Sequence, residues 1–305
     1  MNYLARAIPA FQGLRLPFSR DQIMLLMAAL NEIFLGVDIY LAHSISGTIV
    51  PNEWIPIIFG PIAGILLLLA GLLAIRRRPI ATLIANLIFL ASITVGLMGA
   101  YFHFMRAILP AAPVGERVTI DLIVWAPPIL GPLTFSLVGL LGISAAWAES
   151  PPDSGRLVLW GQRTVQLPYS KTRGFLFLVG LGSLATLISS VLDHARTDFS
   201  NPWLWAPTAV GVLGTLTAVA LGAMDDPRPR EIRVFIASMI LMIVVGLVGV
   251  WLHVNQNLIS NGQIVGERFV RGAPFLAPSL FANMGALGLI ALLDPSEKRV
   301  NSSDA

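Results

Sequence analysis

The chain has 305 residues, of which 55% are hydrophobic and only 12% are charged, and its mean hydropathy is +0.76. A water-soluble globular protein of this length needs more polar surface, so the composition indicates a membrane protein surrounded mainly by lipid. The formal net charge of +3 is small and no nucleic-acid partner is expected. Because the chain has no cysteine, disulfides and thiolate metal ligands are excluded, and a metal would need His, carboxylate or Met ligands.

Apolar stretches long enough to cross the roughly 30 Å hydrocarbon core of a bilayer occur eight times along the chain. We predict transmembrane helices at residues 21–44, 54–75, 80–108, 122–148, 172–196, 203–224, 232–258 and 271–293. The expected fold class is therefore all-α: a polytopic membrane helical bundle. Short tails flank it at residues 1–20 and 294–305.

The basic residues indicate how these helices are oriented. Fifteen of the 20 Lys and Arg residues fall in the tails and alternate connections on one side, and the other five fall on the opposite side. Basic residues concentrate in cytoplasmic loops of membrane proteins. Both termini are therefore expected in the cytoplasm, and the expected location is the inner (plasma) membrane of the cell.

The sequence also contains an internal duplication. Five residue types recur at a constant offset of 151, namely His43, Pro51, Trp54, Pro56 and Gly60 against His194, Pro202, Trp205, Pro207 and Gly211. Two four-helix repeats are predicted, 21–148 and 172–293, joined by a cytoplasmic linker at 149–171. A repeat with an even number of spans begins and ends on the same side, so the halves are expected to be parallel and related by a pseudo-two-fold axis along the membrane normal.

The four histidines of the chain all belong to this duplicated set. His43 and His194 close the first helix of each repeat, whereas His103 and His253 lie in the last third of the third helix. All four are expected near the non-cytoplasmic face. In each third helix two glycines precede the histidine along one helical face, a pattern that permits either close helix packing or room for a flat macrocycle.

These positions give our leading hypothesis, a redox cofactor or metal bound through His43, His103, His194 and His253. In one arrangement each repeat holds a b-type haem between its two imidazoles. In the other the four imidazoles surround one copper or similar ion. The protein would then be a subunit or assembly partner of an electron-transfer complex, with other membrane or periplasmic subunits as partners. The competing interpretation is that the histidines are interfacial anchors.

Two carboxylates support a hypothesis of a different class. Glu32 falls near the middle of the first predicted helix and Asp38 lies closer to its end, and their counterparts in the second repeat are Ser183 and Ser189. Ionisable residues inside membranes are costly and tend to be functional. Glu32 and Asp38 would be proton- or ion-coupling groups of a parallel-repeat secondary transporter. A structural role for Glu32 is a hydrogen bond across the bundle to Asn86 or Ser92.

Helices 122–148 and 271–293 each open with two prolines four residues apart, Pro128 and Pro132 in the first and Pro274 and Pro278 in the second. Such a pair either kinks the start of a helix or breaks it, as at transporter substrate sites. The third hypothesis is a structural membrane subunit without a cofactor. No Walker loop, dinucleotide fingerprint or HExxH motif occurs, so the sequence assigns no enzyme class.

Overall fold

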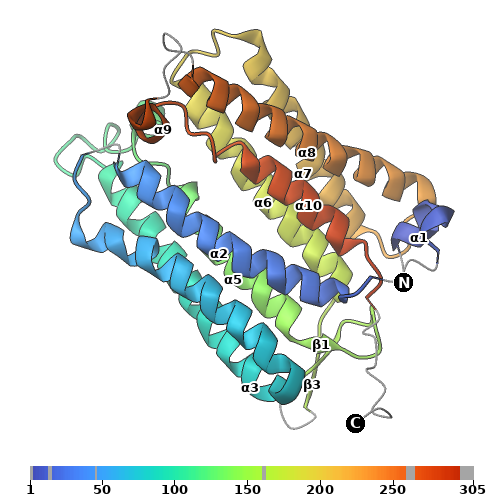
Figure 1. Cartoon of the computed structure of the whole chain (residues 1–305). Helices are drawn as coiled ribbons and strands as arrows, with labels where there is room; N and C mark the ends of the chain where they lie inside the picture. The colour runs from blue at the N-terminus through green and yellow to red at the C-terminus, as the bar shows by residue number, and fades with distance from the viewer. Residues whose placement is uncertain (1–2, 13–15, 45–46, 160–162, 259–264, 296–305) are drawn as a thin grey trace.

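The computed structural model of the chain describes residues 3–12, 16–44, 47–159, 163–258 and 265–295. It is all-α, with 75% of the described residues helical, and the long helices lie roughly side by side (Figure 1). The helices are α1 (Tyr3–Ala7), α2 (Arg20–Ser44), α3 (Trp54–Arg106), α4 (Ile120–Trp125), α5 (Leu130–Ala146), α6 (Lys171–Ala195), α7 (Trp205–Ala223), α8 (Pro229–Leu258), α9 (Gly266–Arg271) and α10 (Ser279–Ala291). Short 3-10 turns, η1 (Pro9–Phe11), η2 (Pro51–Glu53) and η4 (Pro202–Leu204), precede α2, α3 and α7.

Within the described residues, five helical segments are long and apolar enough to cross a membrane: Arg20–Ser44, Pro51–Arg106, Lys171–Ala195, Pro202–Ala223 and Pro229–Leu258. Helices α5 and α10 are also apolar but shorter, with 17 and 13 residues. Large apolar side chains are exposed along the long helices, including Leu72 at 65% and Ile75 at 82%. Lipid is the solvent that suits such a surface, and the chain is therefore a membrane protein.

Helix α3 doubles back on itself at Arg77. This residue has the non-helical angles φ −140° and ψ 62°, and Pro79 follows it closely. Glu53, directly before the helix, forms an ion pair of 3.2 Å with Arg106, its last residue. The two arms, residues 54–76 and 78–106, therefore run in opposite directions, at the positions where the sequence predicts separate helices at 54–75 and 80–108.

The predicted helices 122–148 and 271–293 begin too early. In the structure residues 126–129 are non-helical between α4 and α5, and residues 272–278 are non-helical between α9 and α10. The prolines account for this difference, because each one removes a backbone amide and obstructs the preceding turn. The apolar pattern continues through both breaks, so hydropathy alone does not reveal them.

Backbones approach closely where α5 and α10 cross their neighbours. A Cβ atom added to Gly139 of α5 would lie 2.6 Å from the carbonyl oxygen of Phe89 in α3. One added to Gly285 of α10 would lie 2.5 Å from the carbonyl oxygen of Met239 in α8. Small residues allow such packing in membranes, where apolar burial does not drive helix association.

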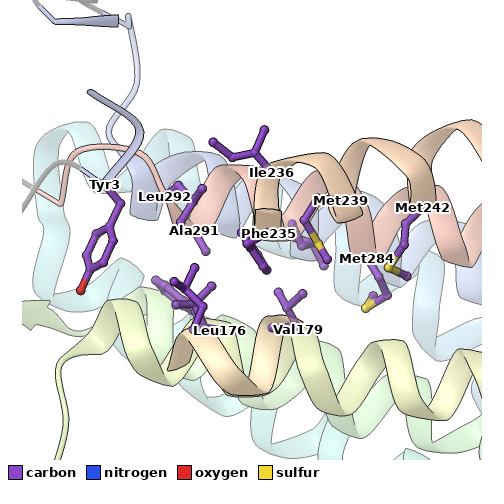
Figure 2. Packing of buried hydrophobic residues seen from close by; sticks show 14 of the residues in the cluster. Tyr3, Leu176, Val179, Phe235, Ile236, Met239, Met242, Met284, Ala291 and Leu292 are labelled. Carbon is purple, nitrogen blue, oxygen red and sulfur yellow. The ribbon is translucent and has the colours of Figure 1, made fainter. Parts of the chain in front are cut away.

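The largest buried cluster lies among α6, α8 and α10, and the N-terminal segment packs against one end of it (Figure 2). Tyr3 is 3% exposed, and the Leu4 amide donates a hydrogen bond of 3.2 Å to the carbonyl oxygen of Leu292. The segment expected to be a simple tail at residues 1–20 therefore contributes to the core of the C-terminal half.

A small antiparallel sheet lies in the predicted linker 149–171. Strands β1 (Ala148–Glu149), β2 (Arg156–Val158) and β3 (Thr164–Gln166) are paired in sequence order. The Glu149 carboxylate accepts hydrogen bonds from the amides of Asp153, Gly155 and Lys171, which connects the sheet to the first residue of α6. The linker thus has a defined structure that its polar composition did not predict.

Candidate functional site

His43 and His103 meet at one end of the bundle. His43 lies in the last turn of α2 and His103 in the last turn of α3. Their ring centroids are 6.0 Å apart and the ring planes are inclined at 62°. The hairpin in α3 is responsible, because it returns the chain to the level at which α2 ends.

Backbone carbonyls orient both imidazoles. Nδ1 of His43 lies 2.9 Å from the carbonyl oxygen of Ile39, and Nδ1 of His103 lies 2.9 Å from that of Pro128. A carbonyl oxygen only accepts, so we infer that Nδ1 carries the hydrogen in each ring. The lone pair of the neutral ring is then on Nε2. This is the orientation that metal-binding histidines commonly have, with the other ring N–H donated to a carbonyl or carboxylate.

The break before α5 explains why the carbonyl of Pro128 is available. In a regular helix this oxygen would accept from the amide of residue 132, but Pro132 has no N–H. It accepts instead from the amide of Gly131 at 3.2 Å and from His103 at 2.9 Å. The histidine therefore replaces a missing backbone donor.

The same arrangement occurs at the break before α10. Residue 278 is a proline, and the carbonyl oxygen of Pro274 accepts from the amide of Ala277 at 3.2 Å and from Nδ1 of His253 at 3.0 Å. His103 and His253 thus each have a structural role at a helix break. From the sequence, the only structural role expected for them was that of an anchor bonded to a loop.

The second histidine pair is arranged more loosely than the first. Nδ1 of His194 lies 3.5 Å from the Ser190 hydroxyl, and its ring contacts Phe199 at a centroid distance of 6.1 Å. His253 lies within electrostatic range of His194 and Asp193. The structure therefore places the two rings of the first pair in contact, whereas the two histidines of the second pair are related only by an electrostatic interaction.

Among the residues that the structure describes, no three His, Asp or Glu side chains are grouped closely enough to hold a metal ion. The arrangement with one pair in each half agrees better with the observed contacts.

Sequence reasoning missed Glu53, which lies beside the first pair. Glu53 is only 8% exposed. Its Oε1 atom lies 4.0 Å from Nε2 of His43 and 3.2 Å from the Arg106 guanidinium. Oε2 accepts from the Val50 amide at 3.1 Å. At the offset of 151 the second half has Leu204 instead. The sequence did contain a signal for Glu53: it lies within the duplicated segment but has no acidic counterpart in the second half.

The glycine faces below His103 and His253 are filled by protein. A Cβ atom added to Gly99 would lie 2.7 Å from Cβ of Pro132, and one added to Gly249 would lie 2.7 Å from Cβ of Pro278. Of the two uses that the sequence permits, close helix packing is the one observed. A macrocycle therefore has no space along these faces.

Glu32 lies inside the bundle and is 0% exposed. The Ser92 hydroxyl donates a hydrogen bond of 2.6 Å to its Oε1, while Oε2 has no partner among the described residues. In the second half the equivalent positions are Ser183 and Met242, whose Oγ and Sδ atoms are 3.7 Å apart. Asn86, the other partner considered for Glu32, instead bonds elsewhere.

Asp38 does not join Glu32 in one site. The two residues are six apart in the continuous helix α2, so their side chains point in directions roughly 120° apart. Asp38 is half-buried, whereas Glu32 is fully buried. A coupling role for each residue is therefore a separate hypothesis.

An open cleft of about 550 Å³ lies beyond the end of α3. Its lining includes Arg106, Glu116, Asp121 and Trp125, which come from the end of α3, the following loop and α4. Arg106 therefore links the cleft to Glu53.

Comparison with protein-family models, curated proteins and solved structures gave no match.

Proposed function

We propose that the chain is a multi-pass protein of the inner membrane with eight spans, arranged as parallel repeats at 21–148 and 172–293. Three observations support this: the reversal of α3 at Arg77, the apolar character of α5 and α10, and contacts that recur at equivalent positions of the two halves. Both termini and the linker 149–171 would face the cytoplasm, as the basic residues indicate.

We further propose that His43 and His103 bind a redox-active metal near the non-cytoplasmic face. The observation that carries this proposal is the ring separation of 6.0 Å between two imidazoles whose Nδ1 atoms face carbonyl oxygens. With metal–nitrogen bonds of about 2.0 Å, two imidazoles on opposite sides of one metal would have centroids roughly 6 Å apart. The observed spacing fits that requirement.

Copper fits the surroundings of this pair better than haem. Imidazole is a suitable ligand for both metals, but Pro132 occupies the glycine face that a macrocycle would need. An ion requires only the space between the rings. His194 and His253 would form a second, more open site, and the protein would exchange electrons with a membrane or periplasmic partner.

An optical spectrum with metal analysis of the purified protein in detergent tests this proposal. The protein should be produced with copper and haem both in supply, as wild type, His43→Ala and His103→Ala. Stoichiometric copper that each substitution reduces is the expected result. A reducible Soret band lost in both variants would identify haem instead, and a colourless, metal-free wild type would contradict the whole proposal.

A second candidate function is transport coupled to protonation of Glu32. The supporting observation is the carboxyl oxygen of Glu32 that has no partner among the described residues, in a position where an unpaired charge is costly. Proton uptake into liposomes containing the protein provides the test. The candidate requires uptake that Glu32→Gln abolishes and Asp226→Asn, at an exposed position, leaves intact. Equal uptake by Glu32→Gln and wild type would exclude it.

A further inference from the structure

Ser92 lies between two oxygen atoms inside the first half of the bundle. Its Oγ atom is 2.6 Å from Oε1 of Glu32 on α2 and 3.0 Å from the carbonyl oxygen of Ile88, one turn earlier in α3. Both separations are within the range of O–H···O hydrogen bonds. A serine hydroxyl has one hydrogen to donate and two lone pairs that accept. A carbonyl oxygen only accepts, so the contact with Ile88 requires the hydrogen of Ser92.

The protonation state of Glu32 decides whether both contacts are hydrogen bonds. If Glu32 is a carboxylate, its oxygens only accept, and the single hydroxyl hydrogen of Ser92 is directed either to Oε1 or to Ile88. If Glu32 carries a proton on Oε1, it donates to Oγ of Ser92, and Ser92 donates to the carbonyl oxygen of Ile88. Each contact then has a hydrogen of its own. The geometry therefore suits a neutral carboxylic acid.

The surroundings of Glu32 do not compensate a negative charge. Glu32 is 0% exposed, its Oε2 atom has no partner among the described residues, and no charged group in that part of the chain lies within electrostatic range. An unpaired charge is costly at such a position. On α2 the nearest acid is Asp38, which points roughly 120° away. Helix α5 has no ionisable residue, and those of α3 lie at its hairpin or near its C-terminal end: Arg76, Arg77, Arg78, Tyr101, His103 and Arg106.

From these contacts we infer that Glu32 and Ser92 form a reversible proton-binding site in which the Ser92 hydroxyl is the switch. With the proton bound on Oε1, Glu32 donates to Ser92 and Ser92 donates to Ile88. When the proton leaves to water, the hydroxyl hydrogen turns from Ile88 to Oε1 and stabilises the carboxylate. The inference rests on the second candidate function for what the proton drives, and it adds Ser92 as the residue that positions the proton.

The second half lacks this site. At the equivalent positions Ser183 and Met242 are buried, with Oγ 3.7 Å from Sδ. A thioether sulfur is a weak acceptor that carries no exchangeable proton. The serine of this pair therefore has a partner whose state does not change with pH, and we expect one proton site of this kind in the protein.

Infrared difference spectroscopy of the full-length protein in liposomes tests this inference, because the C=O stretch of a carboxylic acid is separate from the bands of a carboxylate. At neutral pH wild type should show a carboxylic-acid band that Glu32→Gln removes. Ser92→Ala should shift this band to higher frequency, since the acid loses its acceptor, and Ser92→Thr should restore the wild-type position. Asp38→Asn, which removes another carboxyl group of the same helix, is the control and should leave the band in place.

Raising the pH should remove the band reversibly, because the site then releases its proton. A band that persists at every pH at which the protein stays folded would overturn reversible binding. A wild type without a band that depends on Glu32 would show that Glu32 is charged, and an unchanged frequency in Ser92→Ala would show that Ser92 is not its acceptor; either result overturns the inference. If the spectra agree with the inference but liposomes containing the protein take up no protons, the second candidate function fails alone.

Discussion

Lys171, the first residue of α6, extends its ammonium group to the carboxylate of Asp21 at the start of α2, with Nζ 2.5 Å from Oδ2. A reciprocal contact lies beside it, because Nη1 of Arg20 donates to the Thr172 hydroxyl at 2.6 Å. At the offset of 151, Arg20 corresponds to Lys171 and Asp21 to Thr172. In a two-fold relationship, if position i of the first half contacts position j of the second, then position j of the first half contacts position i of the second. The two contacts here follow this pattern. These contacts support the proposed pseudo-two-fold axis.

Asp21→Ala should strongly destabilise the protein. Lys171 is 3% exposed, and removing its acidic partner leaves a buried ammonium without a counter-charge, at a cost of about 3–5 kcal/mol in unfolding free energy. Unfolding by SDS titration in detergent micelles is the measurement. Adding Lys171→Met should recover only part of the loss, because the buried Arg20 guanidinium, which pairs with Asp21 at 3.1 Å, also loses its carboxylate partner.

The exposed pair of Glu267 and Arg271 provides a control for that prediction. Glu267→Ala should change the unfolding free energy by no more than about 0.5 kcal/mol, since the side chains are 67% and 58% exposed. Equal effects of Asp21→Ala and Glu267→Ala would mean that the buried charges do not hold the two halves together.

His103→Ala and Pro132→Ala should be non-additive. Loss of the imidazole removes a donor to the carbonyl oxygen of Pro128, which we expect to cost about 1 kcal/mol of unfolding free energy. An alanine at 132 restores the amide that a helix would direct to this oxygen. The cost of His103→Ala should therefore be smaller in the Pro132→Ala background.

A double-mutant cycle of four proteins, unfolded under the same conditions, measures this coupling. The matching cycle with His253 and Pro278 should give a coupling of the same sign, because His253 donates to the carbonyl of Pro274 in the same way. Additive effects in both cycles would show that the histidines do not substitute for the missing amides.

Gly139→Ala and Gly285→Ala should both be destabilising. The new methyl group would lie 2.6 Å and 2.5 Å, respectively, from a backbone carbonyl oxygen, and the helices would have to separate. We expect a loss of about 1–3 kcal/mol for each in SDS titration. Gly71→Ala is the control, because its methyl group meets nothing within 4 Å and improves helix propensity. A stable Gly139→Ala protein would contradict the close crossing of α3 and α5.

Glu32→Gln should be tolerated far better than Glu32→Ala. Glutamine keeps an oxygen that accepts from Ser92, whereas alanine removes the acceptor and leaves a cavity, at a cost of about 1–3 kcal/mol. The same SDS titration measures both. If Gln destabilises as much as Ala, the fold depends on a feature specific to the carboxyl group.

Hydropathy and periodicity predicted the long helices, because a membrane span requires an apolar stretch of fixed length. They did not predict that the helices expected at 122–148 and 271–293 begin late, since breaks formed by proline can be as apolar as the helices beside them. The duplicated histidines led us to expect His43 and His103 at the same end of the bundle, and their rings lie 6.0 Å apart there. Glu53 was missed because its partners, His43 and Arg106, meet only after α3 reverses. The packing of the N-terminal segment was also missed, because the residues that it contacts belong to the C-terminal half and are distant in sequence.

Electron paramagnetic resonance of the Cu²⁺-loaded protein in detergent tests the central claim most directly, because hyperfine splitting counts the nitrogen ligands of the bound ion. At one equivalent of Cu²⁺ the account predicts two imidazole nitrogens in wild type, fewer in the double variant Pro132→Ala/His103→Ala, and no change in His194→Ala. Four nitrogens would indicate a single site shared by both halves. A spectrum without imidazole nitrogen would contradict metal binding by His43 and His103.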